Sequence, residues 1–363
     1  MNAIAATNDY ESWLDGLVPI YRPDLKYKHK RMADPHDPFP FFRGTYYLWA
    51  KRWAERAGDL TDAPAVLAIG DLHIENYGTW RDADGRLCWG VNDFDEADSL
   101  PYTNDLVRLA VSVRLARRSW PGVVRTGKAC RAILAGYRQA LEEGGRPFVL
   151  EERYRRLRAL AMHGDREPAE FWEKLNGQLA RPKGELPADV KEALEREMPT
   201  EGLSPRLRFR PRAGMGSLGK PRYVALARWN GSWAAREAKA MTPPATAWAD
   251  GRTDAASLAA EAVGRAVRCP DPCYKPAAGW VLRRLGPRCS RIDLAHLRHH
   301  GDVPRLLRAM GAETANVHLG TAGAADAVLK DLDRRSDGWL ADAARSLGRL
   351  VGRDWEAWRA SRQ

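Results

Sequence analysis

The sequence predicts an α+β fold in which a small antiparallel sheet is flanked by helices from both ends of the chain. From about residue 204 the pattern reads as strand, glycine-rich loop, strand, turn and strand, with Asn230-Gly231 at the turn. A further strand is expected over 280–285, whereas helical spacing of apolar residues prevails before and after this stretch. We therefore expect residues 204–290 to form a small β lobe, and residues 1–203 and 291–363 to form a larger helical lobe.

The first elements lead to a short acidic loop. The chain begins with what reads as an irregular basic segment, followed by a helix over about 45–57. A short apolar run over 63–69, followed by a glycine, suits a buried strand. The loop after this strand has the sequence Gly70-Asp71-Leu72-His73-Ile74-Glu75-Asn76.

A β-hairpin is expected next. Two strand-like runs within 77–91 flank Asp84-Gly85, a dipeptide that tolerates the positive φ of a tight turn. A hairpin returns the chain to its starting point, so Asn76 and Asp93 should become neighbours, with Asp71 at the mouth of the same loop. Mg²⁺-dependent phosphoryl transfer requires such a set, because one Asp accepts the proton of the acceptor while an Asn and a second Asp hold the metal on the nucleotide phosphates.

The remaining helices are placed by apolar spacing and by capping or breaking residues. An amphipathic helix begins near Asp105, with Leu106, Leu109 and Val113 on one face. The other helices are expected at about 127–143, 151–163, 168–180, 187–197, 254–267, 303–318 and 337–360.

The glycine-rich loop carries Gly214, Gly216, Ser217 and Gly219 between two predicted strands. A lone G-x-G-x-x-G pattern is weak evidence for nucleotide binding, and its meaning depends on the elements around it. A Rossmann loop lies between a strand and a helix, whereas this loop leads from one predicted strand into another, as the glycine loop of a kinase does. Glycines at these positions let backbone N–H groups approach nucleotide phosphates. The alternative is a glycine-rich hairpin that binds no ligand.

A cation is also needed on the α- and β-phosphates, and the third predicted strand offers Arg236 and Lys239. Side chains alternate along a strand, so these two lie on opposite faces and only one can reach the nucleotide. We favour Lys239 and keep Arg236 as the alternative. Glu261, on the following predicted helix, is the best-placed partner of this lysine, unless it faces solvent.

These motifs resemble two families. The loop Gly70–Asn76 is similar to the G-D-x-H-x-x-N loop of the aminoglycoside phosphotransferase and choline kinase group, within the protein-kinase-like superfamily, although Ile69 stands where those kinases usually have His. The Asp93-Phe94 pair matches the metal-binding segment of that group. Together with Phe41-Phe42-Arg43-Gly44 and the glycine loop, the order of motifs resembles the bacterial domain-of-unknown-function 2252 family over about residues 20–320.

The kinase-like resemblance implies a role for each motif residue. Asp71 is the catalytic residue, and Asn76 and Asp93 bind metal. Asp95 assists a second metal or stays solvated, and His73 either orients the catalytic loop or is a structural histidine. The implied cofactors are ATP and Mg²⁺.

The order of the motifs implies a circularly permuted fold, because the glycine loop follows the catalytic loop here and precedes it in kinases. Permutation is tolerated when the old termini lie close together and the new ones open in a surface loop. The helix that ends at His318 should then finish close to Gly70. Asp105 resembles the buried Asp that orients the catalytic loop, and Arg43 either reaches a phosphate or forms an ion pair with Asp105 or Glu96.

Composition narrows the remaining classes of protein. The net charge is +11, but Arg residues are interleaved with Glu and Asp along predicted helices, so nucleic-acid binding is not favoured. No apolar run approaches the ~20 residues that span a bilayer, and no secretory signal is visible, so a cytoplasmic protein is expected. Reduced thiols are the default for the five cysteines, with a structural zinc at Cys269-Pro-Asp-Pro-Cys273 as a less favoured alternative.

The sequence therefore predicts an ATP- and Mg²⁺-dependent phosphotransferase with a bilobal, permuted kinase-like fold. The acceptor, the choice between phosphoryl and nucleotidyl transfer and the oligomeric state are left open, and the resemblance implies that helices within about 120–200 select the acceptor. Two alternatives stay open. One is a pseudokinase-like nucleotide- or partner-binding module. The other is a metallophosphoesterase. That class needs further metal ligands, including an Asn-His pair, and the His-rich segment 296–300 does not contain such a pair.

Overall fold

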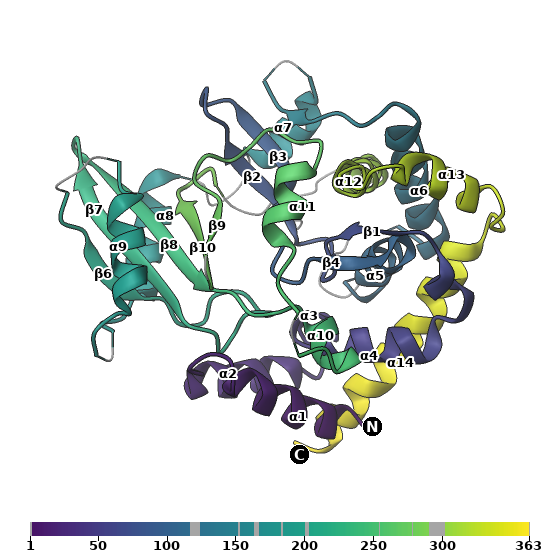
Figure 1. Ribbon diagram of the computed structural model, residues 1–363, viewed down its shortest axis with the longest axis horizontal. Coiled ribbons are helices and arrows are strands. Elements are labelled where there is room, and N and C mark those ends of the chain that lie inside the picture. Colours follow the sequence, from purple (N-terminus) through teal and green to yellow (C-terminus); the bar gives the residue numbers. More distant parts are fainter. Residues whose placement is uncertain are drawn as a thin grey trace.

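The computed structural model describes residues 2–116, 124–151, 153–162, 167–182, 184–199, 203–253, 255–277, 279–289 and 302–362. It has the α+β architecture that the sequence predicts, with helices and three small antiparallel sheets. Figure 1 shows the largest sheet on one side of the molecule and most helices on the other. The His-rich segment 296–300 lies outside the described residues.

The expectation of an irregular segment at the start of the chain is wrong, because three helices form there. They are α1 (Ala3–Asp15), α2 (Arg22–Met32) and α3 (Phe39–Gly44). Asn2 caps the first of them, since its side-chain oxygen accepts a hydrogen bond from the Ala5 N–H at 2.8 Å. The buried residues of α1 recur at helical spacing and include Ala3, Ala6, Tyr10 and Leu14.

The acidic loop and the hairpin form as predicted. They lie among short elements of the larger, mainly helical part of the molecule. This stretch contains α4 (Tyr46–Arg56), a 3-10 helix (Gly58–Asp62), β1 (Ala65–Ala68), β2 (Tyr77–Arg81), β3 (Leu87–Val91), β4 (Asp98–Pro101) and α5 (Tyr102–Leu115). β2 pairs with β3 in the hairpin, β3 also pairs with β5 (Phe148–Val149), and β1 pairs with β4. The acidic loop connects β1 to β2 and therefore lies between two sheets.

The antiparallel sheet expected within 204–290 forms, with five strands where four were predicted, since the strand Lys275–Ala277 was not expected. Its strands are β6 (Arg206–Phe209), β7 (Arg222–Trp229), β8 (Ser232–Ala240), β9 (Lys275–Ala277) and β10 (Trp280–Leu285), in the order β6-β7-β8-β10-β9. The turn between β7 and β8 is Asn230-Gly231, and both residues have positive φ, 46° and 81°. The glycine loop joins β6 to β7.

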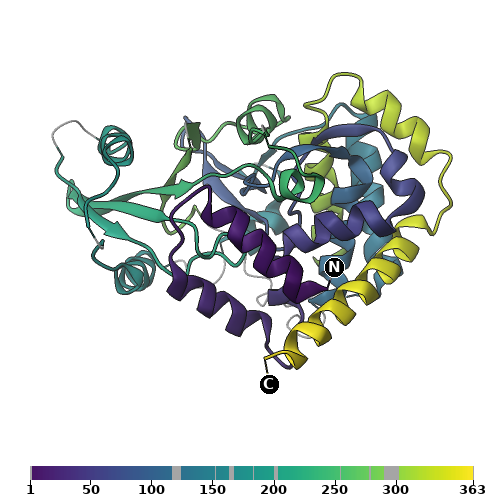
Figure 2. The same ribbon diagram turned by 60° about the horizontal axis from the view of Figure 1, so that its bottom comes forward.

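Two helices that precede this sheet in the chain pack on its opposite faces. Leu175 of α8 (Pro168–Gln178) shares a buried cluster with Val224 and Leu226, whereas α9 (Ala188–Arg196) packs on the alternate residues Ala225 and Ala227. Figure 2 shows the two helices on either side of the strands. The boundary expected at 203/204 therefore separates α8 and α9 from the sheet that they cover.

Helices from both ends of the chain pack together in the larger part. α5 contacts α14 (Trp339–Ala360), and α6 (Thr126–Glu142) contacts α12 (Asp302–His318). The second contact is close because Gly136 and Gly311 face the backbone of the other helix: a Cβ at either position would overlap a carbonyl oxygen. The other helices are α7 (Arg155–Ala161), α10 (Ala245–Asp250), α11 (Ala259–Arg265) and α13 (Ala324–Leu332).

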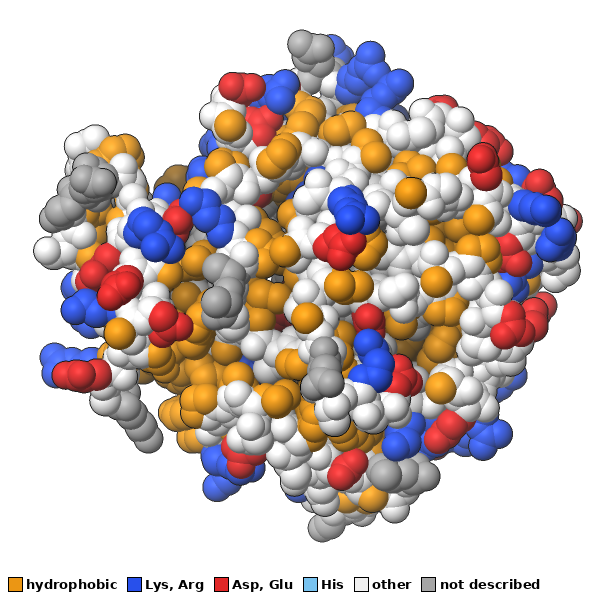
Figure 3. Space-filling view, viewed as in Figure 1, with side chains coloured by type: hydrophobic (Ala, Val, Ile, Leu, Met, Phe, Trp, Pro, Cys, Tyr) orange, Lys and Arg blue, Asp and Glu red, His pale blue; other side chains and the backbone are white. Residues whose placement is uncertain are grey.

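In the part of the chain that the structure describes, no helix is both long and apolar enough to cross a bilayer. Lys and Arg side chains are interspersed with Asp and Glu over the face in Figure 3 rather than gathered by sign. This mixture is what the interleaved charges of the sequence predict.

Candidate active site

Asp105 fixes the start of the acidic loop. One carboxylate oxygen of this fully buried residue accepts a hydrogen bond from the Ile69 N–H at 2.7 Å, and the other accepts one from the Gly70 N–H at 3.0 Å. His318, the last residue of α12, lies 3.0 Å from the same carboxylate through its Nε2. The structure thus brings the end of α12 close to Gly70, although the two are at opposite ends of the chain.

Gly70 has a conformation that only glycine adopts without strain. Its φ is 79°, and a Cβ there would overlap the carbonyl oxygen of Glu96. The loop and the acidic segment after the hairpin are therefore packed backbone against backbone, which places Asp71 beside the second acidic motif.

Arg108 of α5 holds the Asp71 carboxylate. Its Nε and Nη2 both donate to Oδ1, the former at 2.9 Å, and the guanidinium is fully buried. Burial raises the pKa of Asp71, although the charge of Arg108 acts against this shift. Oδ2 accepts no hydrogen bond within the described part of the chain and faces the glycine loop.

Phe42 of the Phe-Phe-Arg-Gly segment and two aromatic residues of α4 form a cage around Arg108. The guanidinium lies over the ring of Phe42 at 4.0 Å and near those of Tyr46 and Trp49, and its Nη2 donates to the Phe42 carbonyl at 3.2 Å. Sequence reasoning missed Arg108. The available signal was a single Arg within the otherwise apolar run 106–111 of a helix.

Arg43 binds the acidic loop itself. It forms an ion pair with Glu75, whereas we expected Asp105 or Glu96, and its Nε donates to His73 Nε2 at 3.4 Å. His73 is buried at the edge of the site. The contacts of both residues fit the structural alternatives of the sequence analysis.

Asn76 and Asp93 are neighbours at the base of the hairpin, as expected. The Asn76 side-chain Nδ2 donates to the backbone carbonyls of Asp71 at 3.2 Å and Asp93 at 3.1 Å. This bonding leaves the amide oxygen, Oδ1, buried without a partner. Oδ1 of Asp95 is buried and unpartnered as well. Such oxygens are costly unless an ion or water meets them.

Lys239, on the third strand of the sheet, reaches Asp93 and Asp95, the acidic pair of the site. Its Nζ lies 3.0 Å from Asp93 Oδ1 and 2.6 Å from Asp95 Oδ2. Burial acts to raise the pKa of Asp93, but the charges of Lys239 and Arg283 and hydrogen bonds with Asp95 and Lys239 together hold that pKa well below its usual range. Burial and the nearby charge of Asp93 raise the pKa of Asp95. The pair therefore shares one positive charge.

Neither Arg236 nor Glu261 reaches the acidic pair through an ion pair. Alternation along β8 puts Arg236 on the other face, where its Nη1 donates to the Ala235 carbonyl at 3.1 Å. Glu261 forms an ion pair with Arg265 of its own helix at 2.9 Å, so the pair expected between Glu261 and Lys239 is not formed.

The glycine loop covers Asp71. A Cβ on Gly216 would lie 3.3 Å from Asp71 Oδ2 and 3.5 Å from the carbonyl oxygen of Arg43. Gly214 and Gly219 have φ of 74° and 100°, so both need glycine. The loop is anchored at its far end, since the Gly219 carbonyl accepts a hydrogen bond from the Tyr21 N–H at 2.9 Å.

A buried ionic cluster supports the loop from the sheet. Glu237 accepts from Arg210 at 2.7 Å, Arg222 at 3.1 Å and Arg283 at 2.6 Å, and it is fully buried. Arg222 also donates to Ser217 Oγ at 2.5 Å. One carboxylate thus meets three guanidinium groups, which leaves an excess of positive charge behind the glycine loop. Sequence reasoning missed this cluster, whose members are spread over four strands or loops.

Asp71, the Asp93 segment and the glycine loop line one pocket between the sheet and the larger part. Lys220, directly after the glycine loop, also lines it, with its Nζ 2.8 Å from Thr242 Oγ1, and was not predicted. Burial raises the pKa of Glu96, at the same pocket, to about 7. The residues that line the pocket are Arg43, Ile69, Asp71, His73, Asn76, Asp93, Asp95, Glu96, Gly214, Met215, Gly216, Ser217 and Lys220.

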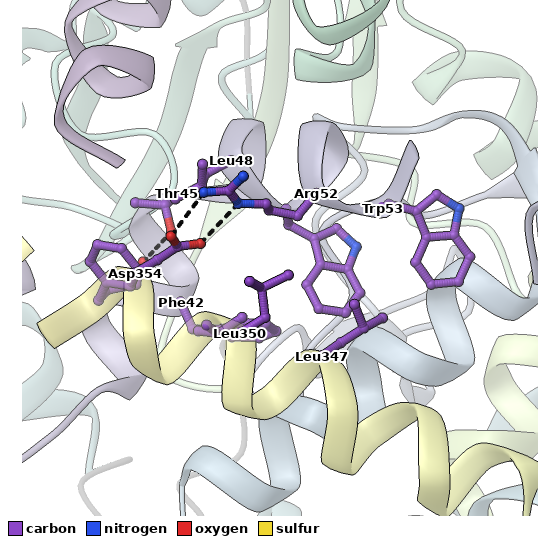
Figure 4. Close-up of a pocket in the computed structure, with 11 residues that line it drawn as sticks. Phe42, Thr45, Leu48, Arg52, Trp53, Leu347, Leu350 and Asp354 are labelled. Atoms are coloured by element: carbon purple, nitrogen blue, oxygen red, sulfur yellow. Dashed lines mark hydrogen bonds and ion pairs between the residues drawn. The ribbon is translucent and has the colours of Figure 1, made fainter. Parts of the chain in front are cut away.

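A second, apolar pocket lies between α4 and α14 (Figure 4). Phe42, Leu347 and Leu350 face it, and at one end Arg52 donates to Asp354 at 3.0 and 3.1 Å. Apart from this paired Arg and Asp it has no convergent polar groups. We therefore interpret this pocket as a gap in the packing of the two helices and not as a second functional site.

Comparison with known proteins reaches only the family level. A family model described as "Uncharacterized protein conserved in bacteria (DUF2252)" matches residues 22–185. This match supports the family resemblance. It covers the acidic loop and the hairpin but not the glycine loop. No curated protein matches the chain, and no solved structure does.

Proposed function

We propose that the protein is an ATP- and Mg²⁺-dependent phosphotransferase whose site has a circularly permuted kinase-like arrangement. The observation that carries this proposal is that Asp71, the Asp93 segment and the glycine loop line one pocket, while Lys239 binds Asp93 and Asp95 at that pocket. These groups come from distant parts of the chain and together provide a base, metal ligands, a cation and backbone N–H groups.

The order of elements in the sheet supports the kinase-like part of the proposal. The glycine loop joins the first two strands and Lys239 lies on the third, as in protein kinases. The permutation is supported by the position of His318, which shares Asp105 with the start of the acidic loop. A chain that once continued from α12 into this loop would have its ends there.

The oxygens around the hairpin fit Mg²⁺. Asn76 Oδ1 and Asp95 Oδ1 are buried without partners, and the half-exposed carboxylate of Asp93 lies beside them. Mg²⁺ prefers hard oxygen ligands of this kind and keeps several waters and phosphate oxygens. These three residues would hold the ion, which when bound would neutralise charge on the phosphates.

Asp71 is placed to accept a proton. Arg108 fixes Oδ1, so Oδ2 is the atom that would take the proton of an acceptor hydroxyl while its oxygen forms a bond to the γ-phosphorus and the bond to the leaving ADP oxygen breaks. The glycine loop now lies directly on Oδ2. Substrates can therefore enter only when this loop lifts.

Thermal unfolding with nucleotide tests the proposal. ATP at about one hundred times its Kd should stabilise the protein by about 2.7 kcal/mol, and Mg²⁺ should be needed for most of this effect. Asp93→Ala should lose the part that depends on Mg²⁺, whereas Asp84→Ala should keep it, because Asp84 is an exposed acid at the tip of the same hairpin. Equal stabilisation with and without Mg²⁺ would remove Asp93 from the role of metal ligand.

Turnover separates an enzyme from a binding module. ATP consumption should be measured against a panel of hydroxyl-bearing metabolites and protein acceptors, with Asp93→Ala as the inactive control. Mg²⁺-dependent ATP binding without turnover on any acceptor, and without slow ATP hydrolysis, would favour the pseudokinase-like alternative.

A further inference from the structure

Three potential metal ligands that the proposed phosphotransferase does not use meet beside the hairpin. They are Asp82, in the turn between β2 and β3, Cys88 of β3, and Cys269, which precedes β9. One ligand atom from each lies within 4.8 Å of those of the other two. Asp82 and Cys88 are buried, and Cys269 is partly exposed.

The structure changes the pairing that the sequence suggested for these cysteines. Cys273, four residues after Cys269, is not its partner: its Sγ accepts from Arg284 Nε at 3.2 Å and Nη2 at 3.0 Å. Cys269 faces Cys88 instead. The Cys-Pro-Asp-Pro-Cys spacing therefore does not describe a site, whereas the fold creates one from distant segments.

We propose that Asp82, Cys88 and Cys269 form a binding site for a thiophilic divalent cation of the zinc class. Two sulfurs and a carboxylate oxygen are ligands that Zn²⁺ takes, and a solvent molecule at the partly exposed side would complete four-coordination. Binding would release the protons of the two thiols, because the thiolate is the ligand. Neither Ca²⁺ nor Mg²⁺ would compete, since both prefer oxygen ligands.

The surroundings already hold each ligand in position. The Asp82 carboxylate accepts from the Arg86 Nε at 2.8 Å, from the Arg86 N–H at 2.9 Å and from the Asp84 N–H at 3.1 Å. Hydrogen bonds of this kind orient the ligating carboxylates of metal sites. The carbonyl of Cys269 accepts from Trp80 Nε1 at 3.0 Å, which fixes the backbone that carries the thiol.

The electrostatics of the group favour a cation. Burial and the proximity of Cys269 and Asp82 raise the pKa of Cys88 to about 12, although the charge of Arg86 acts against this shift. The guanidinium of Arg86 already pairs with Asp82 at 2.8 Å, so a divalent ion would supply the positive charge that the two thiolates lack. A protonated thiol of this kind is also a poor nucleophile, so the same pair is not set up to form a disulfide readily.

The bound cation would fasten the segment before β9 to the metal-binding hairpin. Arg268 already docks this segment, since its Nη1 donates to the Val91 carbonyl at 2.9 Å and its guanidinium lies 4.2 Å from the centre of the Trp80 ring. Val91 is two residues before Asp93. A cation at Cys88 and Cys269 would thus stabilise the hairpin arm that carries Asp93 without touching the nucleotide.

Metal titration of the full-length, reduced and chelator-treated protein tests this proposal. Zn²⁺ is added in competition with a chromophoric chelator, and Co²⁺ is used to detect thiolate charge-transfer absorption. We expect a single tight site whose affinity falls by at least about 100-fold in Cys269→Ser and in Cys88→Ser and by about 10-fold or more in Asp82→Asn. Cys273→Ser is the matched control and should bind as the wild type does.

A measurement without substitutions guards against misfolded variants. Zn²⁺ should protect the partly exposed Cys269 of the wild-type protein from alkylation, and leave the reactivity of Cys289 unchanged, as read by mass spectrometry of the digested protein. The proposal is overturned if the wild type binds Zn²⁺ no more tightly than Cys269→Ser, if Co²⁺ gives no thiolate band, or if protection falls on other cysteines.

Discussion

Asp71 is held on one side and open on the other. Arg108 binds Oδ1 from within an aromatic cage, and Oδ2 faces the glycine loop. In the proposed role of base this hold would keep the geometry of Asp71 fixed, and burial raises the pKa of Asp71, which makes it a stronger base. The Phe-Phe-Arg-Gly segment therefore acts at the site in two ways, through the Phe42 ring that packs on Arg108 and through Arg43, which lines the pocket.

The first prediction concerns Asp71→Asn. Asparagine keeps the shape of the side chain and can still accept from Arg108, but it cannot take up the proton. We expect kcat to fall by roughly 10² to 10⁴, while the Kd for ATP with Mg²⁺ changes little. Steady-state kinetics and nucleotide titration measure the two effects. A variant that kept full turnover would show that Asp71 is not the base.

The second prediction compares Lys239→Met with Arg236→Met. Lys239 is the cation at the acidic pair, whereas Arg236 lies on the other face of β8. Lys239→Met should weaken ATP binding or turnover far more, because a charge on the phosphates is lost. Nucleotide titration of both variants checks this. The reverse order would assign the phosphates to Arg236.

Sequence reasoning placed Asp71, Asn76, Asp93 and Lys239 together because each belongs to a motif with its own local spacing. It did not find Arg108, Lys220 or Glu237. Their roles depend on partners in other strands and helices, and ion pairs over such distances leave no periodic signal in one sequence. Only the buried position of Arg108 in an apolar helix was visible in advance.

At the scale of elements, periodic segments were the easiest to predict. The hairpin around Asp84-Gly85 and the strands around Asn230-Gly231 formed where their turn residues put them. The helices before residue 45 were missed, and in α2 the basic residues obscure a short buried face. Nothing in the periodicity of α8 and α9 indicated which part of the molecule they cover, since a helix pattern fixes a buried face but not its partner.

The third prediction concerns the contact between α6 and α12, which positions His318 under the acidic loop. A Cβ on Gly311 would overlap the carbonyl oxygen of Ile133, and backbone cannot move aside cheaply. Gly311→Ala should therefore lower the free energy of unfolding by roughly 1–3 kcal/mol. Gly352→Ala, in α14 with open space around it, should raise it by about 0.5–1 kcal/mol. Denaturant unfolding of both variants distinguishes the close contact from helix propensity alone.

At the scale of the whole molecule, distant segments are joined by buried polar contacts. Glu313 of α12 is an example, because its Oε1 accepts from the Val91 N–H at 3.1 Å and its Oε2 from Asn316 Nδ2 at 2.9 Å. It thus links the last third of the chain to the hairpin that carries Asp93. The sequence suggested this return of the chain only through the order of its motifs, and no local pattern marked Glu313 as the residue that makes the contact.

The fourth prediction follows from the titration of Glu313. Burial raises its pKa to about 7, while Arg268 acts against the shift. The unfolded chain ionises this carboxyl near its ordinary pKa of about 4.3, so between about pH 4.3 and 7 the folded state binds more protons. The contribution of Glu313 to stability is therefore complete at the acid end of this window and is lost as the pH rises through 7.

Glu313→Gln should remove that share of the pH dependence. Glutamine can keep the hydrogen bond from Val91 and does not ionise, so stability at pH 7.5 relative to pH 5 should improve by roughly 1–3 kcal/mol compared with the wild type. The pKa of Glu96 is also raised to about 7, so this carboxyl titrates in the same window. Glu96→Gln is the matched comparison and should remove a separate part of the pH dependence of stability. Denaturant unfolding at both pH values measures the slope. An unchanged slope in Glu313→Gln would mean that this carboxyl is ionised throughout the window, and that the link between α12 and the hairpin is an ion pair with Arg268 instead.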